Sequence, residues 1–122
     1  MSARVVRGRV AQARGVAAET AACAALERDG WSVLARRLRT KAGELDLVAE
    51  RDGLLAFIEV KARPDLALAA GALGPRQQAR LFAAAELVLA ENPGWGRAGV
   101  RFDVLLVDGA GRIRRIADAL RM

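Results

Sequence analysis

Two acids, Asp46 and Glu59, stand on two short apolar segments that flank the dipeptide Asp52-Gly53. Asp-Gly between alternating apolar runs is a strong hairpin signal. A two-residue turn there sets a register in which Asp46 faces Glu59 on one side of the hairpin. Facing carboxylates repel each other unless a cation lies beside them, and oxygen ligands of this kind suit Mg²⁺ or Mn²⁺. The spacing therefore predicts a metal site formed by these two acids, with the backbone carbonyl of Val60 as a further ligand.

Lys61 follows Glu59 by two residues and so lies on the same face of the predicted strand. The chain has 20 basic residues, and only Lys41 and Lys61 are lysines. An ammonium group can be partly desolvated and can exchange a proton with water, whereas a guanidinium group stays protonated. We therefore expect Lys61 to orient or deprotonate an attacking water. The alternative is a solvated hairpin face on which Glu44, Asp46, Glu59 and Lys61 form ordinary cross-strand ion pairs.

A third acid, Glu19, falls on the apolar side of a helix that we predict over residues 16–29. The segment is rich in alanine and ends at Gly30, a residue that suits a left-handed helix cap. Its apolar stripe includes Val16, Cys23 and Leu26. Glu19 either completes the acid cluster or forms an ordinary salt bridge at the edge of this stripe.

The composition excludes several kinds of site. The chain has no His and no Tyr, so it has no imidazole base, no histidine-containing catalytic triad and no tyrosyl nucleophile. A single cysteine, Cys23, excludes an internal disulfide and a cysteine-rich zinc site, and it fits a reducing compartment. With no apolar run of eighteen residues and no secretory signal pattern, we expect a cytoplasmic protein without a membrane span.

The 122 residues are enough for one domain, and 53% of them are hydrophobic. We predict strands at 31–38, 45–51 and 54–61, a second helix from Pro75 to about Glu91, and strands at 100–107 and 112–117. With the helix at 16–29, the element order is αβββαββ. This order indicates an α/β protein with one mixed β-sheet flanked by helices, spanning 15–122.

The formal net charge of +6 favours a polyanionic partner, nucleic acid before an anionic membrane. Residues 1–14 contain four arginines and no acid, and we interpret them as a mobile basic arm, or alternatively as a solvated tail without a partner. The residues that we expect to contact nucleic acid lie in this arm, at strand ends and on the second helix: Arg4, Arg7, Arg9, Arg14, Arg39, Lys41, Arg63, Arg76 and Arg80.

Three segments together resemble the bacterial YraN-like (UPF0102-type) family: GELDLV at 43–48, FIEVKAR at 57–63 and RFDV at 101–104. Members of that family are similar to archaeal Holliday-junction resolvases. The interval from Asp46 to Glu59 and the Glu-x-Lys triplet resemble the signature of the restriction-endonuclease-like superfamily. The resemblance implies a PD-(D/E)xK core, a Mg²⁺ cofactor, a DNA substrate and a homodimer, and it matches Glu19 to an acid in the family's first helix.

The chain departs from the family pattern at two positions. Arg37 falls in a stretch where the family often has Asn, and Gln77 lies near the start of the second helix, where the family often has Lys. The resulting hypothesis is a Mg²⁺-dependent endonuclease acting on DNA, with branched, Holliday-junction-like DNA as a candidate substrate and Asp46, Glu59, Lys61 and Glu19 as its catalytic residues. The alternative is a nucleic-acid-binding module of the same fold without catalysis.

Overall fold

The computed structural model describes the chain at residues 3–62 and 73–120, with side chains described from residue 15 onward. Its element order confirms the predicted αβββαββ arrangement. The elements are α1 (Ala3–Arg28), β1 (Ser32–Thr40), β2 (Gly43–Arg51), β3 (Leu54–Ala62), α2 (Pro75–Glu91), β4 (Gly99–Val107) and β5 (Ile113–Leu120).

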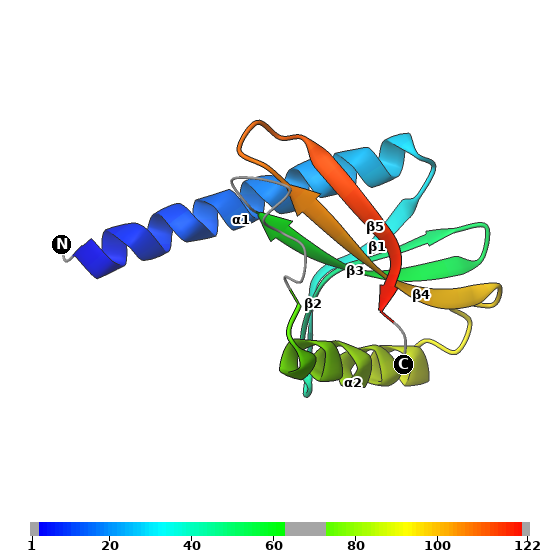
Figure 1. The fold of residues 1–122 in the computed structure, drawn as a ribbon. Coiled ribbons are helices and arrows are strands. Elements are labelled where there is room, and N and C mark those ends of the chain that lie inside the picture. Colours follow the sequence, from blue (N-terminus) through cyan, green and yellow to red (C-terminus); the bar gives the residue numbers. More distant parts are fainter. Residues whose placement is uncertain (1–2, 63–72, 121–122) are drawn as a thin grey trace.

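The five strands form one sheet in the order β1-β2-β3-β4-β5. Neighbouring strands are antiparallel except β3 and β4, which are parallel because α2 connects them across the sheet. The two helices pack on opposite faces of the sheet (Figure 1). This is the mixed sheet flanked by helices that the sequence predicts.

Each face of the sheet has its own apolar core. On the α1 face, Ala22, Cys23 and Leu26 pack against Trp31 and residues of β2, β3 and β4. On the α2 face, Leu81, Ala84, Ala85 and Val88 pack against residues that include Phe57 and Phe102, whose rings lie 5.5 Å apart. The central strands are therefore buried on both sides, which makes the sheet a rigid base for side chains at its ends.

The β2–β3 hairpin has the turn that the sequence predicts. Asp52 and Gly53 both have positive φ, 52° and 82°, as a two-residue type I′ turn requires. The strands pair from Arg51 opposite Leu54 to Leu47 opposite Ile58, which is the predicted register. This register directs Asp46 toward Glu59.

The first helix differs from the prediction in two ways. It begins at Ala3 instead of residue 16, because residues 3–15 contain no proline and include good helix formers. Val16 is 41% exposed, so it does not belong to the buried stripe, whereas Ala18 does. The backbone of residues 3–14 is thus part of α1. The mobility of this segment and the contacts of its arginines stay predictions, because their side chains lie outside the described residues.

Within the described residues, neither α1 nor α2 is long and apolar enough to cross a membrane.

Candidate active site

Asp46 lies where β2 departs from a regular strand. Leu45 packs into the core on the α2 face, but Leu47, two residues later, packs into the core on the α1 face. In a regular strand both side chains would point to the same face. At this irregular point the Asp46 carboxylate accepts a hydrogen bond from the backbone N–H of Val60, with 2.8 Å between nitrogen and Oδ2. The aspartate is therefore anchored directly to the strand that bears Glu59.

Glu59 is buried, with its side chain only 10% exposed. Its Oε1 accepts a hydrogen bond from Nε2 of Gln77 at 2.8 Å and lies 3.5 Å from Nζ of Lys61. Its Oε2 is buried and has no hydrogen-bond partner among the described residues. A buried carboxylate oxygen without a donor is costly unless it bears a proton or contacts a cation.

Both acids of the pair have raised pKa values. Burial, followed by the negative charge of Asp46, raises the pKa of Glu59 from its ordinary 4.5 to about 7, despite the opposing effect of Lys61. Burial also raises the pKa of Asp46, although the hydrogen bond from Val60 opposes the shift. A hydrogen bond between the two carboxyl groups further raises the pKa of Glu59 and lowers that of Asp46. At neutral pH and without a cation, Glu59 therefore holds the proton for much of the time.

Glu19 extends from α1 to the same region of the protein. It is buried, and its charge contributes to the raised pKa of Asp46, so the two carboxylates lie near each other. Its Oε2 accepts a hydrogen bond from Nε of Arg37 at 2.8 Å. Glu19 thus forms the salt bridge that the sequence allowed as an alternative, and it does so beside the acid pair.

Arg37 has an unusual backbone conformation on β1. Its φ is 49°, in the left-handed region that residues other than glycine, asparagine and aspartate rarely adopt. Because Arg36 pairs with Leu47 and Leu38 pairs with Leu45, Arg37 lies across from Asp46 in the β1–β2 register. Both strands are therefore irregular at the same point, which directs the Arg37 guanidinium to Glu19.

These groups suit a magnesium ion better than a zinc-type site. Within the described residues, no three Asp, Glu or Cys side chains form a group that could hold a metal ion by themselves. Mg²⁺, however, usually binds to one or two carboxylates and keeps several waters. Asp46 and Glu59 supply those two carboxylates, and a cation would satisfy the buried Oε2 of Glu59. Val60 lies next to Glu59 on β3, where its carbonyl oxygen is a third candidate ligand, and Glu19 is a candidate for holding a coordinated water.

The register of the Asp52-Gly53 turn also predicts that Glu44 faces Lys61, but the structure gives these two residues other partners. Lys61 forms its ion pair with Glu59, whereas Glu44 lies 3.7 Å from Nε of Arg39 on β1. The Lys61 side chain is 18% exposed, so its ammonium group is partly desolvated, as proton exchange with a water requires. The alternative of a solvated hairpin face does not describe Glu59 and Lys61, since both are largely buried.

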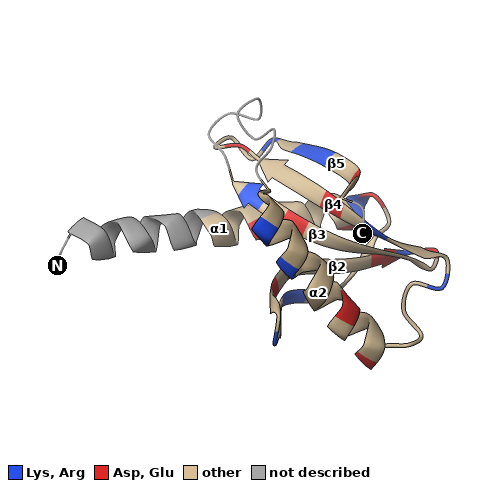
Figure 2. Ribbon diagram, turned by 60° about the horizontal axis from the view of Figure 1, so that its bottom comes forward, with Lys and Arg blue, Asp and Glu red and all other residues tan. Residues whose placement is uncertain are grey.

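The expected nucleic-acid contacts are exposed where they can be described. Arg39, Lys41, Arg76 and Arg80 all lie at the surface, and the Arg39 side chain is 90% exposed. Figure 2 shows basic positions at the start of α2 near an acidic position of β3, in agreement with the hydrogen bond from Gln77 to Glu59. Arg63 lies outside the described residues, as do the side chains of Arg4, Arg7, Arg9 and Arg14.

Gln77 and Arg37 are the two residues of this region that were not predicted as site residues. Both were visible in the sequence only as departures from the family pattern. Gln77 contacts the buried Glu59 from the first turn of α2, and Arg37 contacts the buried Glu19. No local pattern predicts either contact, because each joins residues eighteen positions apart.

Comparison with known proteins identifies the family. Residues 18–107 match the model of the "Uncharacterised protein family UPF0102". A UPF0102 protein of Granulibacter bethesdensis is 60% identical over 119 residues, which are 98% of this chain and 75% of that protein. A UPF0102 protein of Azorhizobium caulinodans is 50% identical over 95% of this chain and 88% of its own length. A UPF0102 protein of Ruegeria pomeroyi is 43% identical over 98% of this chain and 97% of its own length. The matched segment contains Glu19, Asp46, Glu59, Lys61 and Gln77, and the chain belongs to the UPF0102 family.

Proposed function

We propose that this chain is a divalent-metal-dependent nuclease that hydrolyses phosphodiester bonds of DNA. The observation that supports this most is the buried pair of Asp46 and Glu59, with an unsatisfied carboxylate oxygen and the ammonium group of Lys61 beside it. A purely structural hairpin gains nothing from burying two acids that repel each other. A site that must hold a divalent cation requires that arrangement.

Each residue has a role in this proposal. Asp46 and Glu59, with the carbonyl of Val60, hold Mg²⁺ or Mn²⁺, and Glu19 orients a coordinated water. A bound divalent ion offsets the charge that builds up on the scissile phosphate and lowers the pKa of a bound water. Lys61 orients the attacking water through its ammonium group, which lies 3.5 Å from Glu59 and is largely removed from solvent. It takes the water's proton only as the neutral amine, after it has released its own proton to solvent. Gln77 holds the carboxylate of Glu59 in place.

The substrate and the assembly follow from the same resemblance. The resemblance of YraN-like proteins to archaeal Holliday-junction resolvases favours branched DNA as the substrate and a homodimer as the active form. The surface arginines and the net charge of +6 suit contacts with phosphate groups. Sedimentation of the chain with and without DNA distinguishes a monomer from a dimer.

A second candidate function is a nucleic-acid-binding module without catalysis. The salt bridge between Glu19 and Arg37 favours it, because Arg37 supplies a positive charge to an acid that a metal-bound water would otherwise contact. In that case Arg37 and Lys61 balance two of the three acids of the cluster, which are Glu19, Asp46 and Glu59. The proton held by Glu59 neutralises the third, and no metal ion is required.

A cleavage assay separates the two functions. End-labelled duplex, flap and four-way-junction DNA are incubated with the protein in Mg²⁺, in Mn²⁺ and in EDTA. The nuclease proposal predicts cleavage of at least one substrate with either metal and none with EDTA. DNA binding without cleavage under every condition would contradict it and would favour the binding module.

A further inference from the structure

Three arginines surround one tryptophan on the face of the sheet opposite the α2 helix. Trp31 is 2% exposed and belongs to the core on the α1 face. The guanidinium carbons of Arg51, Arg101 and Arg115 lie 4.7, 5.0 and 4.9 Å from the centre of its ring. We call these four residues the Trp31 arginine cluster. Cation–π contacts of this kind stabilise a guanidinium group while leaving its N–H edges free to bind a ligand.

A buried aspartate holds two of the arginines. Asp103 Oδ2 accepts hydrogen bonds from Nη2 of Arg101 at 3.0 Å and from Nη2 of Arg115 at 2.7 Å, and its side chain is fully buried. Arg51 donates from Nη1 to the backbone carbonyl of Asp29. Each guanidinium has five N–H donors, so these bonds occupy a minority of those available.

The Trp31 arginine cluster bears more positive than negative charge. Three guanidinium groups meet around the ring. The carboxylate of Asp103 forms ion pairs with Arg101 and Arg115, and Asp29 lines one hollow together with Arg115, so the positive groups outnumber these two acids. Any two of the guanidinium carbons are within about 10 Å of each other, since each lies about 5 Å from one ring centre. Inside the cluster, Nε of Arg101 and Nε1 of Trp31 are buried without a hydrogen-bond partner among the described residues. An anion bound at the exposed N–H groups would relieve this excess of positive charge.

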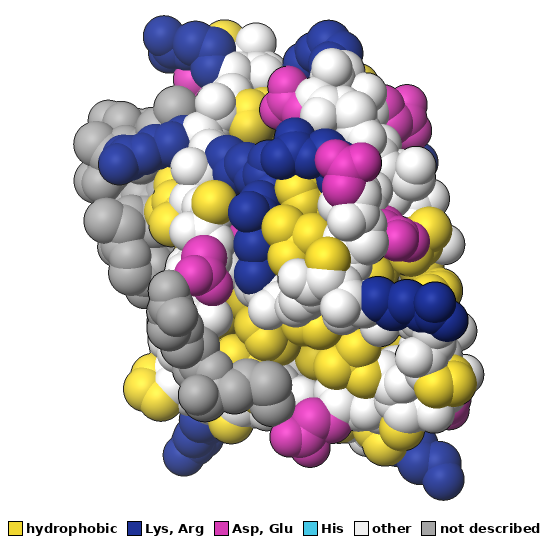
Figure 3. Space-filling model, turned by 90° about the vertical axis from the view of Figure 1, so that its right-hand side faces the viewer, with side chains coloured by type: hydrophobic (Ala, Val, Ile, Leu, Met, Phe, Trp, Pro, Cys, Tyr) yellow, Lys and Arg dark blue, Asp and Glu magenta, His cyan; other side chains and the backbone are white. Residues whose placement is uncertain are grey.

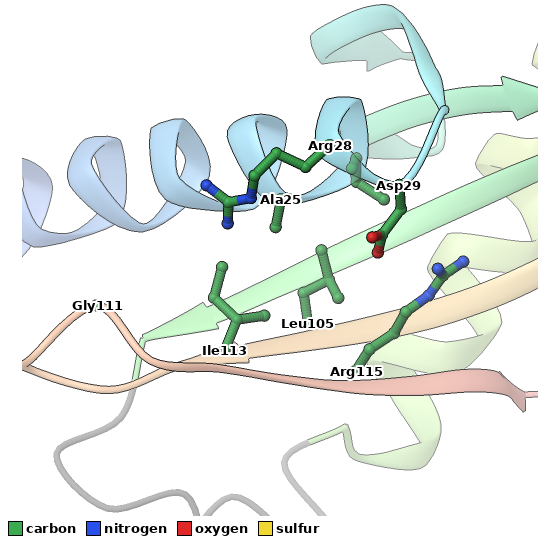
Figure 4. A pocket seen from close by; sticks show the side chains of 8 residues that line it. Ala25, Arg28, Asp29, Leu105, Gly111, Ile113 and Arg115 are labelled. Carbon is green, nitrogen blue, oxygen red and sulfur yellow. The ribbon is translucent and has the colours of Figure 1, made fainter.

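The cluster is open to solvent. Arg51 is exposed, and the side chains of Arg101 and Arg115 are 21% and 23% exposed. Lys and Arg side chains gather in the middle of one face of the molecule (Figure 3). Beside the cluster, a hollow of about 320 Å³ opens between the end of α1 and strands β4 and β5, with Arg115 and Asp29 facing across it (Figure 4).

We propose that the Trp31 arginine cluster binds phosphate groups of a nucleic-acid backbone at a place separate from the acid pair. Arg51 lies beside the turn of the β2–β3 hairpin, opposite Leu54, whereas Glu59 and Lys61 lie toward the other end of β3. The segment bound at the cluster is therefore not the segment that is cut. Several guanidinium groups spread over one exposed area suit a chain of phosphates better than a single small anion. The inference rests on the proposed function only for naming nucleic acid as the source of the phosphates.

The test uses Trp31 as its own reporter. The chain has two tryptophans, so Trp95→Phe leaves Trp31 as the sole source of tryptophan emission. This variant is titrated in EDTA with a short DNA duplex, and separately with inorganic phosphate. We expect the duplex to change the Trp31 emission in a saturable, salt-dependent way, with inorganic phosphate acting only at far higher concentration. If inorganic phosphate saturates the emission change at the same total phosphate concentration as the duplex does, the assignment to a nucleic-acid backbone is overturned.

Matched charge variants locate the contact. Arg51→Gln and Arg114→Gln each remove one exposed positive charge, but only Arg51 belongs to the cluster. For Arg51→Gln, we expect the log–log salt slope of duplex binding to fall by about 0.9, the value for one phosphate contact, and no change for Arg114→Gln. Asp29→Asn removes an acid that borders the hollow, so it should tighten binding. Equal slopes for Arg51→Gln and Arg114→Gln, with the folded state verified by circular dichroism, would overturn the proposal.

The cluster proposal and the nuclease proposal can fail separately in these experiments. Duplex binding that depends on Arg51, together with no cleavage in any metal, would contradict the nuclease and support the cluster. Metal-dependent cleavage with an Arg51→Gln protein that binds like the Arg114→Gln control would support the nuclease and overturn the cluster. Arg115→Gln serves as a second variant only if its melting temperature matches that of the parent, because Arg115 also holds the buried Asp103.

Discussion

The side-chain amide of Gln77 donates a hydrogen bond to Oε1 of Glu59, with 2.8 Å between the two atoms, and so ties the first turn of α2 to β3. The bond fixes one oxygen of a buried carboxylate and leaves the other, Oε2, for a proton or a cation. An outer contact of this kind orients a metal ligand without touching the metal.

Because Gln77 donates to this carboxylate, we expect it to affect both the pKa of Glu59 and the proposed activity. Gln77→Leu removes a donor to the carboxylate, so the pKa of Glu59 should rise further above 7, whereas the added cation in Gln77→Lys should lower it. Carboxyl-carbon NMR titration measures both shifts. We also expect Gln77→Leu to slow metal-dependent cleavage at least tenfold, as for other outer contacts of metal ligands. Unchanged pKa values in both variants would show that this hydrogen bond does not hold Glu59.

The raised pKa of Glu59 predicts how stability depends on pH in the absence of metal. The folded state holds the Glu59 proton up to about pH 7, whereas the unfolded state releases it near 4.5. Between these values the folded state binds more protons, so the free energy of unfolding should fall as pH rises, by roughly 3 kcal/mol in all. Above pH 7 the contribution is lost and the profile is flat. Urea denaturation in EDTA from pH 4.5 to 8 measures this slope.

Glu59→Gln is the control for that profile, because an amide of the same shape does not titrate. The variant should lose most of the slope between pH 4.5 and 7, and it should be more stable than the parent at pH 8. A parent profile that rises over this range would mean that Glu59 is not protonated in the folded state.

The left-handed backbone at Arg37 predicts that the glycine variant at this position is more stable than the alanine variant. Arg37→Ala and Arg37→Gly both remove the salt bridge to Glu19, but only glycine adopts a φ of 49° without strain. On a regular strand alanine is the more stable residue. Here we expect Arg37→Gly to exceed Arg37→Ala by about 1 kcal/mol in the free energy of unfolding. The reverse order in thermal or urea denaturation would exclude the left-handed conformation.

Local signals in the sequence predicted much of the fold. Asp52-Gly53 predicted a turn with two positive φ angles and, through it, the β2–β3 register. Pro75 predicted the start of α2, because proline suits the first turn of a helix. The start of α1 was missed because a cluster of arginines was interpreted as a charged arm, although the same residues are good helix formers.

The site was predictable only as far as the hairpin determines it. Asp46, Glu59 and Lys61 are brought together by strand register, which local sequence encodes. The contacts from Arg37 to Glu19 and from Gln77 to Glu59 depend on how α1 and α2 pack on the sheet. The Trp31 arginine cluster likewise joins three strands that the sequence separates widely. Tertiary packing, which no short motif specifies, sets these contacts.

The arginines of residues 1–14 are expected to contribute electrostatic affinity without taking part in cleavage. Replacing Arg4, Arg7, Arg9 and Arg14 by Gln keeps the chain length. For each arginine that touches a phosphate, the replacement should lower the log–log salt slope of duplex binding by about 0.9. At saturating DNA the cleavage rate should stay within about twofold of the parent, because the acid pair is unchanged. Fluorescence anisotropy at several salt concentrations measures the slope, and an unchanged slope would show that these arginines do not bind DNA.

The most direct test is single-turnover cleavage of one labelled DNA in Mg²⁺. Comparing the parent with Asp46→Asn and Lys61→Arg decides whether the acid pair and Lys61 perform metal-dependent hydrolysis. Asp46→Asn weakens a metal ligand, so it should lose both Mg²⁺ binding and cleavage. Lys61→Arg keeps the charge but replaces a compact ammonium by a larger group, so it should lose most cleavage while binding DNA nearly as well as the parent. Cleavage by Asp46→Asn at the parental rate would exclude the acid pair as the site of hydrolysis.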